Sequence, residues 1–230
     1  MNYFSAHYAV KKIGRGGFPQ SQDIEMEPGR MVTDDDFVWN LQFDKLPDFN
    51  PYIGTLILQD GSILTDFISS AIISVGFVCS EKVKKIVEKQ KTTNLRFYNL
   101  SVKHKNIYYN NYYLMHSVNN YDNKVDFESS VFQIFRIENN SWFGKNIILK
   151  DFDEYTKLIK ELSNNKYGDW QKIEAKEIRF KNNFKPEHNI FNLFGINSHI
   201  YFSEQLKKDL DENKITGIQY NADDIITEFK

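Results

Sequence analysis

The stretch Val78–Lys85 reads VCSEKVKK, and the stretch Tyr201–Lys208 reads YFSEQLKK. In each copy a short apolar run precedes a serine, Ser80 or Ser203, and a glutamate follows that serine. A serine at this place accepts a hydrogen bond from an unpaired amide in the first turn of a helix. The glutamate then lies at the positive end of the helix dipole. The phrase therefore predicts a strand that leads directly into a helix, at two places in the chain.

The likeness between the copies continues beyond the two phrases, in the pairs Val87/Leu210, Glu88/Asp211, Thr93/Thr216, Asn94/Gly217, Leu95/Ile218 and Phe97/Tyr220. Apolar residues one turn apart predict a helix with one buried side. Asn94 and Gly217 are of the types that best tolerate a left-handed turn. We therefore predict two strand–helix–turn–strand units, at about 77–98 and 200–220. Their serines are interpreted as helix caps, because no base lies nearby in the sequence to activate a nucleophile.

The rest of the chain alternates strand and helix signals. Apolar residues at helical spacing predict a helix over 151–162, and Asp66 is expected to cap a short helix through Ile73. Strands are predicted over 54–59 and 62–64, joined as a hairpin by Asp60-Gly61, and over 107–118, 131–137, 147–149 and 173–180. Interspersed elements of both kinds indicate the α+β class, with a mixed or antiparallel sheet and a few helices.

We expect a single domain over residues 1–230 with a loop-rich N-terminal arm at about 1–36. The arm is predicted from the glycines and prolines within residues 11–30, which are Gly14, Gly16, Gly17, Pro19, Pro28 and Gly29.

Composition narrows the class of protein. With 41% hydrophobic and 15% aromatic residues, the chain of 230 residues has enough apolar side chains for a sizeable core. Its net charge of −2 argues against a general nucleic-acid binder, because such proteins usually have a basic surface. The single cysteine, Cys79, lies in an apolar stretch, which favours a reducing compartment. Residues 1–5 do not begin a secretory signal, and the apolar segment 67–79 is too short to span a bilayer. We expect a cytoplasmic protein whose partner is neither nucleic acid nor a membrane.

Few residues have catalytic or metal-binding spacing. The five histidines are scattered, so we expect no metal and no cofactor. Asp122 and Asp126 are near enough in sequence to serve as an acid and a base, but a turn in which they bond to local backbone also explains them. Asp34, Asp35 and Asp36 form the candidate contact site. Such carboxylates are usually solvated, yet they also suit a basic protein partner.

A set of short phrases stands in a fixed order along the chain: Asp66–Ile68, Val78–Val83, Asn94–Tyr98, Tyr112–Met115, Asp122–Ser130, Ile190–Phe194, Ile200–Leu206 and Thr216–Ile218. Their order and spacing over about residues 60–222 resemble the bacterial polymorphic-toxin immunity proteins of family eleven, formerly a domain of unknown function. The family usually has arginine where Lys82 and Gln205 stand here. Residues 1–60 match no part of the pattern, and the helix at 151–162 looks like an insertion.

The resemblance implies a protein that is not an enzyme and that is encoded beside a toxin. It would bind this cognate toxin and block its active site or a surface that the toxin needs. Because the shared phrases are mostly scaffold, the contact surface is expected in residues 11–36, 138–146 or 163–169. Two alternatives stay open: an adaptor or chaperone for a secreted effector, and a small hydrolase that uses Asp122, Asp126 and a histidine.

Overall fold

The structure is a computed structural model, and it describes residues 2–11, 13–14, 17–90, 92–138, 141–163, 171–182 and 184–221. Thirteen strands and three α-helices occur in these residues, and the strands form sheets of six, four and three. The predicted α+β class is confirmed. The strands are β1 (Tyr3–Tyr8), β2 (Ser21–Glu25), β3 (Thr55–Leu58), β4 (Phe67–Ile68), β5 (Phe77–Ser80), β6 (Leu95–His104), β7 (Ile107–Ser117), β8 (Val131–Glu138), β9 (Ser141–Ile147), β10 (Gln171–Glu177), β11 (Ile190–Asn192), β12 (Ile200–Ser203) and β13 (Ile218–Asn221). The helices are α1 (Glu81–Val87), α2 (Phe152–Ser163) and α3 (Glu204–Glu212), with short 3-10 helices η1 (Val38–Asn40) and η2 (Asp122–Lys124).

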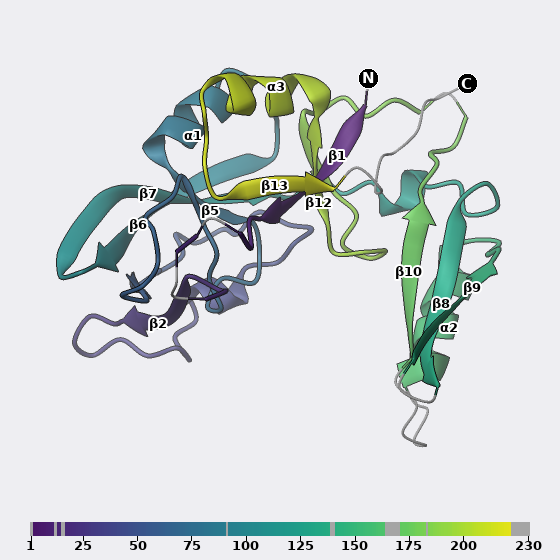
Figure 1. Ribbon diagram of the computed structural model, residues 1–230, viewed down its shortest axis with the longest axis horizontal. Coiled ribbons are helices and arrows are strands. Elements are labelled where there is room, and N and C mark those ends of the chain that lie inside the picture. The colour runs from purple at the N-terminus through teal and green to yellow at the C-terminus, as the bar shows by residue number, and fades with distance from the viewer. Residues whose placement is uncertain are drawn as a thin grey trace.

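The six-stranded sheet has the order β2-β3-β6-β7-β5-β4, and all its pairs are antiparallel except β3 with β6. β6 and β7 form its long central hairpin. The hairpin turns at Lys105 and Asn106, whose φ angles of 49° and 63° suit a two-residue connection between twisted strands. Figure 1 shows this hairpin at one end of the molecule and strands β8, β9 and β10 with α2 at the other.

The four-stranded sheet has the order β11-β12-β1-β13 and is antiparallel throughout. Its strand β1 comes from the N-terminus, and β2 pairs with β3 in the larger sheet. Two strands therefore lie within residues 1–36, which we expected to be rich in loops. The N-terminal segment is a structural part of both sheets.

Each predicted repeat unit is observed, and in each a further strand lies between the two strands of the unit. In the first unit β7 lies between β5 and β6, and in the second unit β1 lies between β12 and β13. The hydroxyl of Ser80 accepts a hydrogen bond from the amide N–H of Val83 (3.5 Å). The hydroxyl of Ser203 accepts one from the amide N–H of Leu206 (3.2 Å). Both predicted helix caps are confirmed.

The two units pack against each other through their helices. Figure 1 shows α1 and α3 together on one side of the sheets, and Lys82 Nζ on α1 donates to the carbonyl of Asn213 after α3 (2.6 Å). Equivalent residues of both copies form one buried core, which includes Phe67, Phe77, Cys79, Val83, Val87, Ile190, Ile200, Phe202, Leu206 and Leu210. The repeat therefore supplies one of the hydrophobic cores of the described residues.

Three local predictions are wrong. One is the strand at 147–149, because β9 ends at Ile147. The other two concern Asp66 and residues 54–64. Asp66 does not cap a helix: β4 follows it directly and pairs with β5. Residues 54–64 do not form a hairpin, because β3 pairs with β2 and β6 while Ser62 forms only an isolated bridge to Gly14. In both places a pairing with a distant segment decides the structure. The predicted helix at 151–162 and the strands over 107–118 and 131–137 are confirmed with small shifts of their ends.

Candidate functional site

The predicted contact residues lie in a loop, residues 30–44, which we call the acidic loop. The guanidinium of Arg30 forms ion pairs with Asp34 (3.3 Å) and with Asp36. It also lies 4.1 Å from the centre of the Tyr52 ring. Asp35 is exposed, whereas Asp34 and Asp36 are half-buried, and within the described residues Asp35 forms no ion pair. Of the three predicted carboxylates, Asp35 is the one that faces solvent without a cation.

The acidic loop is held in one shape by buried residues and hydrogen bonds. Phe37 and Val38 insert into the core and are 0% and 2% exposed. The carboxamide of Asn40 donates to the carbonyls of Asp34 and Asp35, at 3.0 Å and 3.1 Å. The indole N–H of Trp39 donates to the carbonyl of Ile72 (2.8 Å). The loop is therefore preorganised, which lowers the entropic cost of binding a partner.

Large apolar side chains stand exposed among these carboxylates. Trp39 is 52% exposed, and Phe43, Met31 and Val32 are 42%, 61% and 40% exposed. Single exposed apolar residues are common on protein surfaces, but interface centres combine aromatic anchors with a polar rim. The acidic loop has this composition. It suits contact with a protein whose facing surface is basic.

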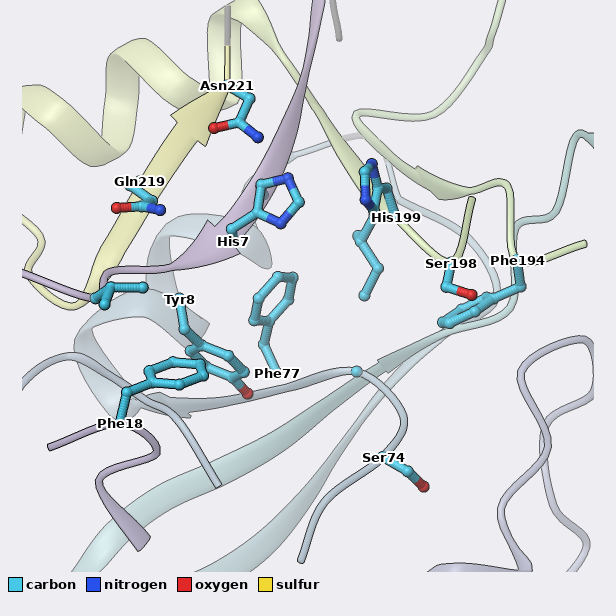
Figure 2. Close-up of a pocket in the computed structure, with 14 residues that line it drawn as sticks. His7, Tyr8, Phe18, Ser74, Phe77, Phe194, Ser198, His199, Gln219 and Asn221 are labelled. Carbon is cyan, nitrogen blue, oxygen red and sulfur yellow. The ribbon is translucent and has the colours of Figure 1, made fainter. Parts of the chain in front are cut away.

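A cavity of about 360 Å³ opens where β1, β12 and β13 meet the segment that leads into β5. Figure 2 shows His7 and His199 in this cavity with Phe77 below His7. The two imidazole rings lie edge to face, with their centres 4.6 Å apart. Gln219 and Asn221 line the cavity from β13, and among the described residues that line it none is Asp, Glu, Lys or Arg. The described lining residues give the cavity hydrogen-bonding groups and aromatic rings.

A second cavity, of about 330 Å³, brings Asp122 and Asp126 together. Asp122 is 9% exposed, and its Oδ2 accepts the amide N–H of Gly195 (2.8 Å). Burial raises the pKa of this carboxyl group. Asp126 Oδ2 accepts the hydroxyl of Ser129 (2.9 Å), and no histidine is among the lining residues. Asp122 is bonded to a distant segment and Asp126 within its own turn. The cavity therefore does not assemble the acid, base and histidine of the hydrolase alternative, which stays a prediction.

The other predicted contact regions are only partly described. Residues 141–146 belong to β9 and are not a loop. Residues 139–140 and 164–169 lie outside the described part of the chain. Among the described residues no group of three or more His, Cys, Asp or Glu side chains is placed to hold a metal ion. Cys79 is fully buried, and burial raises the pKa of its thiol.

Comparison of the chain with protein-family models and with curated proteins finds no match. The resemblance to the immunity family therefore stays a prediction. Within the described ranges, no helix is long and apolar enough to cross a membrane.

The repeat extends further than the sequence indicated. Strand register pairs Phe77 with Met115 in the first unit and Ile200 with Ala6 in the second, so β7 and β1 hold equivalent places. Their sequences, YYLMH at 112–116 and YFSAH at 3–7, both end in histidine. This likeness is hard to find in the sequence because β1 comes before the second unit along the chain, whereas β7 comes after the first unit. This equivalence makes His7 a candidate binding residue. Its spacing from other residues in the sequence does not indicate such a role.

Proposed function

We propose that this protein is an immunity protein that binds a cognate toxin in the cytoplasm and blocks it by direct contact. The observation that supports this most is the acidic loop, a preorganised segment that carries both an exposed indole, Trp39, and an exposed carboxylate, Asp35. The resemblance of the sequence to immunity proteins supplies the kind of partner. The protein performs no reaction of its own in this proposal.

The acidic loop supplies two effects that a neutralising contact needs. Asp35 and the neighbouring carboxylates attract a basic partner and raise the rate of encounter. Trp39 then fills a depression on the partner and carries much of the binding energy, as buried aromatic anchors do. Because Arg30 already holds Asp34 and Asp36, little ordering remains to be done when the complex forms.

Growth rescue tests the proposal. The toxin candidate encoded beside this protein is expressed alone and together with it, and we expect growth only when both are present. A double variant, Asp35→Lys with Trp39→Ala, is expected to fold and to lose the rescue, because both residues are exposed. Continued growth inhibition with every adjacent toxin candidate contradicts the proposal. A toxin that stays active while bound indicates the adaptor or chaperone alternative.

A further inference from the structure

The cavity of about 330 Å³ at the start of α2 gathers acidic side chains from three parts of the chain. Its described lining includes Asp122, Asp126, Glu128, Asp151 and Asp153, and none of these forms an ion pair with a described residue. Asp126 is bonded to Ser129, and Asp151 Oδ1 accepts the amide N–H of Glu154 (2.9 Å). The carboxylates of Glu128 and Asp153 are exposed and make no hydrogen bond to a described residue.

Asp122 is the buried carboxylate of this cavity. It is 9% exposed, and its Oδ2 accepts the amide N–H of Gly195 (2.8 Å). Its other oxygen, Oδ1, is buried and has no hydrogen-bond partner within the described part of the chain. Burial raises the pKa of this carboxyl group, and the Asn120 carboxamide and the Gly195 N–H offset part of the rise. A buried carboxylate is costly without full compensation, so a cation beside Asp122 would be favoured.

We propose that this cavity binds a guanidinium group, with Asp122 at its buried end and Glu128 and Asp153 at its exposed end. The guanidinium supplies the positive charge that Asp122 lacks, and its outer N–H groups donate to the two exposed carboxylates. Such charge-assisted hydrogen bonds are stronger than neutral ones. This inference is independent of the acidic loop and of the proposed neutralising activity.

The lining favours a guanidinium over a more compact cation. Among the described residues, no three acidic side chains are placed to share one metal ion. A guanidinium is wider, because it has five N–H donors in one plane and can reach carboxylates that lie apart. Phe127 and Phe152 also line the cavity, with their ring centres 6.1 Å apart. Aromatic faces attract a guanidinium and are of little use to a strongly hydrated ion.

Two lysines of the lining compete with an incoming cation. Lys181 Nζ donates to the carbonyl of Asn123 (3.0 Å), so this ammonium group is already held. Lys150 is exposed and forms no ion pair with a described residue. Lys150→Met is therefore expected to tighten guanidinium binding by roughly threefold, because a like charge near the site is removed.

The direct probe is N-acetyl-arginine N-methylamide, titrated into the full chain labelled with ¹⁵N. We expect saturable NMR shifts of the Gly195 amide, because this N–H is bonded to Asp122. The citrulline analogue has nearly the same shape without the charge and is expected to bind roughly tenfold more weakly. Asp122→Asn keeps an acceptor for Gly195 and is expected to weaken binding of the arginine probe by roughly tenfold.

A double variant, Glu128→Gln with Asp153→Asn, gives a second test that alters no buried residue. We expect it to weaken binding of the arginine probe by roughly fivefold. Asp60→Asn, at an exposed carboxylate outside the described lining, is the matched control and should bind as wild type.

Free arginine, which has the same net charge as the probe, distinguishes the two sources of a guanidinium. Tighter binding of free arginine assigns the site to a small molecule, and tighter binding of the probe assigns it to an arginine of another protein. Either result supports a guanidinium site. The proposal is overturned if the arginine probe binds no more tightly than the citrulline analogue. It is equally overturned if folded Asp122→Asn and double-variant proteins, checked by thermal melting, bind the probe as tightly as wild type.

Discussion

At the scale of single residues, Asp66 is, with Lys82, one of the side chains that join the two units. Its Oδ1 accepts the hydroxyl of Ser80 (2.9 Å), the cap of α1. Its Oδ2 accepts both the amide N–H and the hydroxyl of Thr216, each at 3.0 Å, next to the turn before β13. Asn189 holds the equivalent place in the second unit, where its Oδ1 accepts the hydroxyl of Ser203 (2.7 Å). The predicted helix cap at Asp66 is thus replaced by a bond between units.

Asp66→Ala is expected to lower the free energy of unfolding by about 2 kcal/mol, because hydrogen bonds to a carboxylate are stronger than neutral ones. Urea denaturation followed by circular dichroism measures this change. Asp48→Ala, at an exposed carboxylate, is the matched control and is expected to change stability by less than about 0.5 kcal/mol. Equal effects of the two substitutions contradict the role of Asp66.

His116 gives the fold a dependence on pH. Burial lowers the pKa of its imidazole from the ordinary value of 6.5, and the nearby charge of Arg96 lowers it further. The unfolded chain therefore binds a proton near pH 6.5 that the folded chain does not bind, so stability is lost as pH falls below this value. In His116→Asn, which keeps an N–H donor without titrating, this loss is expected to shrink by up to about 1.4 kcal/mol per pH unit. Identical pH profiles between pH 5 and 7 in urea denaturation contradict this account.

At the scale of elements, the turn between helix and strand restricts which residue types each unit can have there. Asn94 and Gly217 have φ angles of 52° and 85°, which confirms the left-handed turns predicted from the sequence. Gly217 is also tightly enclosed, since a Cβ there would lie 2.1 Å from the carbonyl oxygen of Phe67. The second turn therefore requires glycine for space as well as for conformation.

Gly217→Ala is expected to destabilise the protein by at least about 2 kcal/mol, because the added methyl group forces the backbone of β4 to move. Gly29→Ala is the matched control: its φ of 86° is similar, but nothing lies within 4 Å of the added Cβ. We expect the control to lose only about 1 kcal/mol from backbone strain. Thermal melting compares the two variants. An equal decrease in Tm contradicts the claim that the enclosure of Gly217 by Phe67 adds to the loss of stability.

The elements that local sequence determines were predictable, and those that distant pairing determines were not. Ser80 and Ser203 cap helices through contacts a few residues away, so their pattern is visible in the sequence. The two residues of β4 form a strand only because β5 lies beside them, and β3 is fixed by β2 and β6. The aspartates of the acidic loop were predicted as a contact site. The anchoring of Trp39 on Ile72 and the cavity at His7 depend on tertiary contacts that the sequence does not display.

At the scale of the whole molecule, the two candidate binding regions adjoin. The ring of Phe43, at the end of the acidic loop, lies 5.0 Å from that of Phe194, which lines the cavity at His7. His116 Nε2 also donates to the carbonyl of Gln42 in this loop. The duplicated core holds both regions in fixed positions.

The affinity of the purified protein for the toxin encoded beside it, measured by isothermal titration calorimetry, tests the central claim most directly. We predict that the wild-type protein binds and that Trp39→Ala weakens binding at least about tenfold, as loss of a buried aromatic anchor does. Ile148→Ala, which removes an apolar side chain that is 77% exposed outside the acidic loop, should bind as wild type. No binding by the wild-type protein contradicts the immunity function, and undiminished binding by Trp39→Ala contradicts the acidic loop as the contact surface.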